Sequence, residues 1–129
     1  HYQMPPSAQS KLISIVEGTV LDVVVEVRKR SPNFGKYISE ELSSENKKQL
    51  FIPRGFAHGY ICLSNTSLMT YKVDNYYNKT AEVIIAFDDP QLNIDWQFPA
   101  DKILLSKKDK SIPRFQAGQH FDYNQSLYD

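Results

Sequence analysis

The chain has 129 residues, a length at which one domain can bury a hydrophobic core without disulfides or a structural metal. Its 15 Lys and Arg balance its 15 Asp and Glu, so charge gives no case for binding nucleic acid or an anionic membrane surface. No apolar run reaches the ~20 residues of a membrane span, no segment resembles a signal peptide, and the single cysteine, Cys62, cannot form an internal disulfide, so we expect a soluble cytoplasmic protein.

The dominant hydrophobic period along the chain is two, which is typical of half-buried β-strands. The expected strands, in chain order, are 11–17, 20–28, 36–42, 49–52, 57–63, 67–73 and 82–87. Glu17-Gly18-Thr19 has the composition of a tight hairpin turn between the first two strands. Many short strands separated by turn residues at roughly 8–12-residue spacing favour an all-β sandwich or barrel.

The residues after Pro90 depart from this period. A short helix is expected to start near Ser106, and the polar and aromatic residues 116–129 predict a loosely held tail. We therefore assign residues 1–115 to a barrel and 116–129 to a tail. Because His1 stands where an initiator methionine would and a strand follows almost at once, we also expect this chain to be part of a longer protein.

The three histidines, His1, His58 and His120, are the first candidates for chemistry. No two histidines are one residue apart, and neither HExxH nor a cluster of Cys and His is present, so the sequence does not support a metal site. His58 lies in FIPRGFAHGY, where strand alternation puts it on one face with Phe56 and Tyr60. This pattern favours a buried core histidine with hydrogen-bond partners over a catalytic one.

Tyr71 and Asp109 are further polar candidates, and each also has a structural interpretation. Tyr71 lies on an expected strand and is typical of a core aromatic residue whose hydroxyl reaches the rim. Asp109 ends SKKD, and its spacing from Ser106 matches a capping box at the start of a helix. Composition and periodicity thus predict a β-barrel with a few polar side chains and leave its function open.

Several runs of this sequence share the order and spacing of the motifs of one known family. They are HYQ…AQSKL, GTVLDVVVEVR, SPNFGKY, LSSENKKQLFIPRGFAHGY, YKVDNYY, DDPQLNIDW and LSKKD. From His1 to about Pro113 the chain resembles the dTDP-4-dehydrorhamnose 3,5-epimerases, a branch of the cupin-like jelly rolls. The resemblance implies an all-β, cupin-like jelly-roll barrel of antiparallel strands with a short C-terminal helical segment, here without the family's N-terminal strands.

The resemblance implies a nucleotide-sugar epimerase that acts on dTDP-4-keto-6-deoxyglucose in dTDP-L-rhamnose or related deoxysugar biosynthesis, without metal or cofactor. Each epimerisation removes a proton α to the C4 ketone and returns one from the opposite face, at C3, C5 or both. This chemistry needs a base on one face, an acid on the other and a cation near the developing enolate oxygen.

The family's motifs carry a role to individual residues of this chain. By this resemblance, His1 is the base, Asp109 orients it, Lys11 stabilises the enolate and Tyr71 donates the returning proton. The resemblance assigns substrate contacts to His58, Tyr77 and Glu82. It also favours the pair with His1 over the capping box as the role of Asp109.

The partners that the resemblance implies are a dTDP-sugar substrate and a second copy of the chain, in a homodimer whose upstream strands complete the partner's sheet. The alternative function is a non-catalytic sugar-nucleotide-binding cupin domain, and a metal-dependent cupin oxygenase is a more distant one. Retention of base, acid and cation favours the enzyme, because a binding module needs no matched acid and base.

Overall fold

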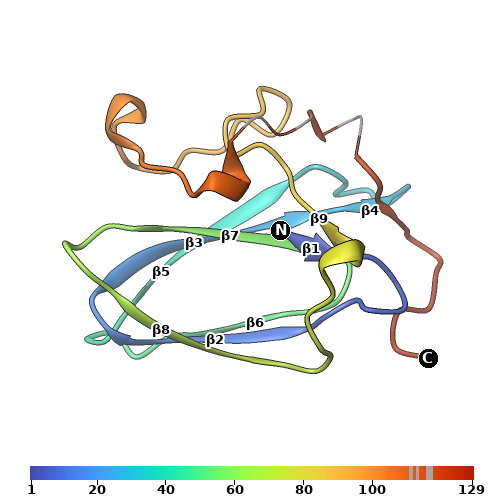
Figure 1. Cartoon of the computed structure of the whole chain (residues 1–129), viewed down its shortest axis with the longest axis horizontal. Coiled ribbons are helices and arrows are strands. Elements are labelled where there is room, and N and C mark those ends of the chain that lie inside the picture. The colour runs from blue at the N-terminus through green and yellow to red at the C-terminus, as the bar shows by residue number, and fades with distance from the viewer. Residues whose placement is uncertain (111, 113, 116–117) are drawn as a thin grey trace.

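Two three-stranded antiparallel sheets face each other in the computed structural model, which describes residues 1–110, 112, 114, 115 and 118–129 (Figure 1). The first sheet has the order β5-β3-β7, with β3 (Thr19–Glu26) between β5 (Tyr37–Ser43) and β7 (Phe56–Cys62). The second has the order β6-β2-β8, with β2 (Lys11–Glu17) between β6 (Gln49–Ile52) and β8 (Leu68–Val73).

Short elements surround these sheets. The paired short strands are β1 (Tyr2–Gln3) with β9 (Glu82–Val83), antiparallel, and β4 (Arg28–Lys29) with β10 (Phe121–Asp122), parallel. Single turns of 3-10 helix are η1 (Lys79–Ala81), η2 (Ala100–Lys102) and η3 (Lys107–Asp109). The predicted all-β fold and the short helical segment near Ser106 are confirmed.

Most of the long strands lie where the period of two predicts them. The bounds of β2 and β6 are the predicted ones, and those of β3, β5, β7 and β8 differ by one or two residues at an end. The strand predicted over 82–87 is wrong beyond Val83, because only Glu82 and Val83 find a pairing partner, in β1. The two-residue strands escaped prediction because so short a segment has no period.

The turn at Gly18 connects the two sheets, so the predicted hairpin is wrong. β2 pairs with β6 and β8, whereas β3 pairs with β5 and β7. Gly18 has a φ of 82°, and a Cβ at this position would lie 2.3 Å from the carbonyl oxygen of Thr66. A tight glycine turn is present as predicted, but the pairing of its flanking strands depends on which faces they bury.

β3 is buried on both faces, which explains its almost uninterrupted run of apolar residues. Its Val20 and Val24 pack between the sheets, in the cluster Ile13, Ile15, Val20, Val24, Leu42 and Ile52. Its Leu21, Val23 and Val25 pack on the opposite side, in a cluster that also holds Leu92, Phe115, Phe121 and Leu127. The long loop after β9 and the tail therefore cover the outer face of this sheet (Figure 1).

The described part of the tail, 118–129, is packed onto the barrel, so the prediction of a loosely held tail is wrong there. Phe121 is 1% exposed and lies in register with Arg28, and Leu127 is also buried. Two isolated apolar side chains, those of Phe121 and Leu127, hold this segment on the barrel. Isolated apolar residues have no periodicity, so the sequence pattern could not predict this packing. Gln116 and Ala117 lie outside the described residues, and the division of the chain at 115/116 stays a prediction.

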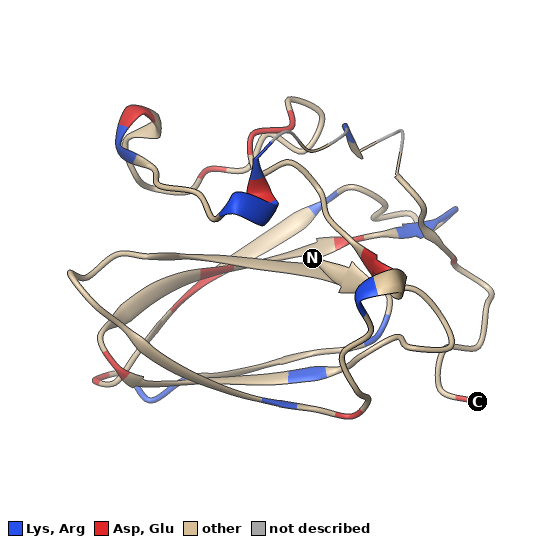
Figure 2. Cartoon of the chain, in the orientation of Figure 1, with Lys and Arg blue, Asp and Glu red and all other residues tan. Residues whose placement is uncertain are grey.

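Positive and negative residues are interspersed along the fold (Figure 2). The formal net charge of zero reflects equal numbers of the two signs, 15 of each. Among the described residues, no helix is long and apolar enough to cross a membrane.

We expect Phe121→Ala to lower the free energy of unfolding by about 3–4 kcal/mol, the cost of emptying a buried aromatic site. Phe121 packs against Tyr2 with ring centroids 5.5 Å apart. Leu104→Ala, at a side chain that is 97% exposed, is the control and should change the free energy by less than about 0.5 kcal/mol. Urea denaturation measures both variants, and equally small effects would show that the tail lies outside the cooperative core.

Candidate active site

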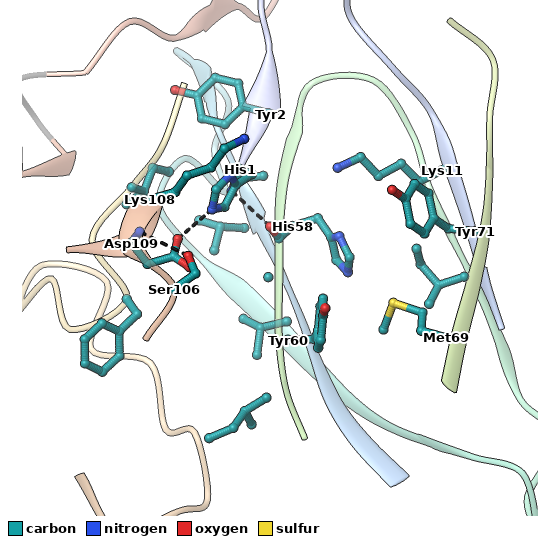
Figure 3. A pocket seen from close by; sticks show the side chains of 18 of the residues that line it. His1, Tyr2, Lys11, His58, Tyr60, Met69, Tyr71, Ser106, Lys108 and Asp109 are labelled. Carbon is teal, nitrogen blue, oxygen red and sulfur yellow. Dashed lines mark hydrogen bonds and ion pairs between the residues drawn. The ribbon is translucent and has the colours of Figure 1, made fainter. Parts of the chain in front are cut away.

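His1 lies beside β7 and places its imidazole between two carboxylates. The backbones of His1 and His58 exchange two hydrogen bonds, His58 N to His1 O at 3.0 Å and His1 N to His58 O at 2.9 Å. The His1 Nδ1 is 3.0 Å from Glu82 Oε1. The His1 Nε2 is 2.6 Å from Asp109 Oδ1 (Figure 3). An imidazolium can donate to both carboxylates, whereas a neutral imidazole can donate to only one.

Asp109 is held by Ser106 at the start of η3. The Ser106 Oγ accepts a hydrogen bond from the backbone N–H of Asp109 at 3.3 Å and donates to its Oδ2 at 2.6 Å. The carboxylate thus uses Oδ2 for the helical turn and Oδ1 for His1, so the capping contact and the contact with the histidine coexist. Burial raises the pKa of Asp109, but the hydrogen bonds from Ser106 and His1 outweigh it and hold this pKa below its usual value.

Glu82 connects His1 to a tyrosine and a lysine. Its Oε2 accepts hydrogen bonds from the Tyr77 hydroxyl at 2.9 Å and from the Lys108 ammonium at 3.0 Å. Burial opposes ionisation of this carboxyl, yet the hydrogen bonds from His1, Lys108 and Tyr77 lower its pKa to about 2. The structure thus brings the predicted residues His1, Tyr77 and Glu82 together, and it adds Lys108, which no sequence pattern singled out.

Lys11 and Tyr71 lie on the opposite wall, on the neighbouring strands β2 and β8 (Figure 3). Tyr71 is in register with Ile13, and Lys11 lies two residues before Ile13, so both side chains emerge from the same face of the sheet. Burial lowers the pKa of the Lys11 ammonium, and the negative charges of Asp22 and Glu82 oppose this shift. The wall therefore presents a cation and a phenol toward His1 and His58.

His58 is a buried histidine with a carboxylate partner, as its position on the strand predicted. It is 9% exposed, and its Nε2 lies 2.8 Å from Oδ2 of Asp22, whose side chain is fully buried. The sequence analysis missed Asp22, although a lone carboxylate within the apolar run VLDVVVEVR is a signal that could have revealed it. His58 also lines the same cavity as His1, so its buried contact and exposure to a ligand are compatible.

One cavity of about 1210 Å³ contains all of the predicted site residues in its wall. They are His1, Lys11, His58, Tyr71, Tyr77, Glu82 and Asp109. Aromatic side chains that include Tyr60, Tyr76 and Trp96 also line the cavity. With an imidazole and its carboxylates on one wall and an ammonium and a phenol on the other, the arrangement can remove a proton from one face of a ligand and return one to the other.

Comparison with known proteins yields one consistent result. A family model described as dTDP-4-dehydrorhamnose 3,5-epimerase matches residues 1–117. The curated dTDP-4-dehydrorhamnose 3,5-epimerase of Shigella flexneri is 46% identical over 121 residues, which are 94% of this chain and 66% of that protein.

Solved structures agree. The dTDP-4-dehydrorhamnose 3,5-epimerase of Elizabethkingia anophelis NUHP1 is 47% identical with a TM-score of 0.87, over 90% of this chain and 63% of that one. The dTDP-6-deoxy-D-glucose-3,5-epimerase of Legionella pneumophila Philadelphia 1, in complex with dTDP-4-keto-L-rhamnose, is 38% identical with a TM-score of 0.90, over 96% and 66%. These likenesses confirm the cupin-like jelly roll, and the chain spans slightly less than two thirds of the length of these relatives.

We expect acid to destabilise the fold as the pH falls from about 4.5 to about 2. The folded-state pKa of Glu82, about 2, lies below the ordinary 4.5, so its stabilisation is complete above pH 4.5 and is lost as the pH falls through 2. Glu82→Gln should be less stable than the wild type at pH 7, and the difference should shrink toward pH 2. Urea denaturation across this range measures it.

Glu41→Gln is the control for this prediction, because Glu41 is an exposed carboxyl on β5. It should keep the acid dependence of the wild type. An equally steep loss of stability in Glu82→Gln and the wild type would contradict the assignment of this acid dependence to Glu82.

Proposed function

Because this chain belongs to the dTDP-4-dehydrorhamnose 3,5-epimerase family, we propose that the protein is a nucleotide-sugar epimerase that acts on dTDP-4-keto-6-deoxyglucose. It removes the proton α to the C4 ketone, at C3, C5 or both, and returns one from the opposite face. The observation that carries the proposal is the pairing of His1 and its two carboxylates on one wall with Lys11 and Tyr71 on the other wall of one cavity.

The base in this proposal is Nδ1 of His1. Asp109 is the nearer carboxylate, and by accepting the proton of Nε2 it selects the tautomer whose lone pair is on Nδ1. The substrate C–H then takes the place of Glu82 Oε1 at Nδ1, while Tyr77 and Lys108 retain Glu82 through its other oxygen. After proton transfer, the imidazolium is stabilised by the carboxylate of Asp109.

Lys11 stabilises the enolate, and Tyr71 completes the inversion. An ammonium beside the C4 oxygen offsets the charge that develops there, an effect of about 3–4 kcal/mol for one well-placed donor in a dry site. The phenol of Tyr71 delivers the returning proton from the wall opposite His1. Both steps move protons only, so the reaction requires no metal or redox cofactor.

The remaining residues of the site hold the substrate. His58, oriented by Asp22, contacts the sugar, and Tyr77 and Glu82 contact the thymidine part. The alternative, a non-catalytic sugar-nucleotide-binding cupin domain, would use the same contacts without proton transfer. Exchange of substrate protons with solvent therefore separates the two functions.

We expect the purified protein in D2O to incorporate deuterium into dTDP-4-keto-6-deoxyglucose at C3, C5 or both, measured by NMR and mass spectrometry. His1→Ala should lower the exchange rate by about 10²–10⁴-fold, because it removes the base. Tyr71→Phe should impair epimerisation more than exchange at the carbon that His1 deprotonates.

Tyr123→Phe is the matched control for the tyrosine variant, because Tyr123 does not line this cavity. It should keep wild-type rates. Binding of dTDP in a thermal-shift assay with no exchange above the uncatalysed rate would overturn the epimerase and favour the binding domain.

We also propose that the protein is a cytoplasmic homodimer. Large apolar side chains are exposed on strands of both sheets, including Ile38 at 61% and Phe51 at 60%, which supports contact with another surface. The single cysteine supports a reducing compartment.

Static light scattering of the purified protein should give twice the mass of one chain. Burial of the exposed apolar strand positions in the interface is the physical reason for this expectation. A monomer at all accessible concentrations would contradict the dimer.

A further inference from the structure

Four residues from distant parts of the sequence form a closed ring of hydrogen bonds, through side chains and backbone N–H groups, near the first residue of β2. The ring consists of Ser10, Asp74, Arg54 and Tyr128. The Ser10 N–H donates to Asp74 Oδ1 at 2.7 Å, and Arg54 Nε donates to Asp74 Oδ2 at 3.2 Å. The hydroxyl of Tyr128 accepts the Arg54 backbone N–H at 3.0 Å and lies 3.0 Å from Ser10 Oγ, which closes the ring.

The ring surrounds the backbone position of Lys11. Ser10 directly precedes Lys11, whose partners in the sheet are Ile52 on β6 and Val73 on β8. Asp74 directly follows Val73, and Arg54 lies two residues after Ile52. Each of the three strands that meet at Lys11 is therefore fastened to the ring within two residues of the register position.

Opposite charges and packing against the tail stabilise this ring. Burial raises the pKa of Asp74, but the hydrogen bonds from Ser10 and Arg54 outweigh it and keep this pKa below its usual value, so Asp74 is an anion at neutral pH. Arg54 also donates to the carbonyl of Leu127 at 2.6 Å and lies 4.9 Å from the ring centroid of Tyr128. Leu127 is buried in the outer core cluster, so the tail segment that carries Tyr128 is anchored.

The Lys11 side chain depends on its backbone for its position. Among the residues that the structure describes, its ammonium forms no hydrogen bond or ion pair, and it interacts with Asp22 and Glu82 only through their charge. A stabilising cation must hold its distance to the reacting oxygen within a fraction of an ångström to retain its effect. Because Lys11 is the first residue of β2, the position of this strand end sets the distance from its ammonium to the reacting oxygen.

We propose that Tyr128 is a positioning residue for Lys11: through Ser10 and Arg54, its hydroxyl fixes the start of β2 and thereby the place of the ammonium in the cavity. The inference rests on the proposed function, in which Lys11 stabilises the enolate. It assigns the tail a part in the reaction although the tail contributes no side chain to the cavity wall in the described residues. Tyr128 itself is 58% exposed, so its contribution comes from the hydroxyl contacts and the stacked Arg54.

The test is Tyr128→Phe, which removes the hydroxyl and keeps the aromatic side chain that stacks on Arg54. We expect kcat for epimerisation to fall about tenfold and KM to stay within about twofold, because the loss falls on placement of the ammonium in the transition state. Tyr123→Phe is the matched control, since Tyr123 lies in the same tail and its hydroxyl makes no hydrogen bond with any described residue. It should leave kcat and KM unchanged. An unchanged kcat in Tyr128→Phe, or an equal effect of both variants, overturns the proposal.

A double-mutant cycle checks that the ring acts as a unit. Ser10→Ala removes the other half of the same hydroxyl contact, so the double variant with Tyr128→Phe should lose no more than about twofold beyond either single variant. Fully multiplicative losses would overturn the proposal.

A readout that does not require activity separates this proposal from the proposed function. In a ¹⁵N NMR titration of the lysine ammonium groups, the pKa of Lys11 should move toward its ordinary value in Tyr128→Phe, because a looser strand end leaves the ammonium less buried. It should not move in Tyr123→Phe. If the wild-type protein shows no exchange, the proposed function fails, and an unshifted Lys11 pKa in Tyr128→Phe then overturns the positioning role by itself.

Discussion

Burial of β3 on both faces is the constraint on which the rest of the structure depends. A strand in this position needs a cover on each side, and the second sheet supplies one while the loop after β9 and the tail supply the other. The loop that covers the outer face also carries Asp109 to His1, which lies beside β7. The packing of the core thus brings together the two ends of the matched sequence.

The same strand places a carboxylate in the interior. Asp22 faces the space between the sheets, in register with Tyr60 and beside His58, and its contact with His58 compensates part of the cost of burying a charge. The site therefore contains three imidazole–carboxylate contacts. The contact of His58 with Asp22 is buried, and those of His1 with Glu82 and Asp109 are partly open to the cavity.

Electrostatic balance across the cavity agrees with the proposed proton transfers. Removal of a proton from the substrate creates a positive imidazolium at His1 and a negative enolate, and each has an opposite charge near it in the protein. In the proposed reaction Asp109, on η3, stabilises the imidazolium, and Lys11, on β2, stabilises the enolate. In the proposed reaction, the separation of the walls lets a proton leave one face of the sugar and another return to the opposite face.

The sequence by itself determined the long strands, the all-β class and, through the resemblance of its motifs, the residues that line the cavity. A period of two is a local property, since alternate residues of a strand face opposite sides. Motif identity is likewise read residue by residue, which is why His1, Lys11 and Asp109 could be named together. Only the tertiary structure decided that the turn at Gly18 joins two sheets and that the tail packs on the barrel. It also decided that Asp22 contacts His58, Lys108 contacts Glu82 and Tyr128 contacts Ser10. These features depend on contacts between residues far apart in the sequence, and such contacts form only where burial of both faces of β3 brings distant segments together.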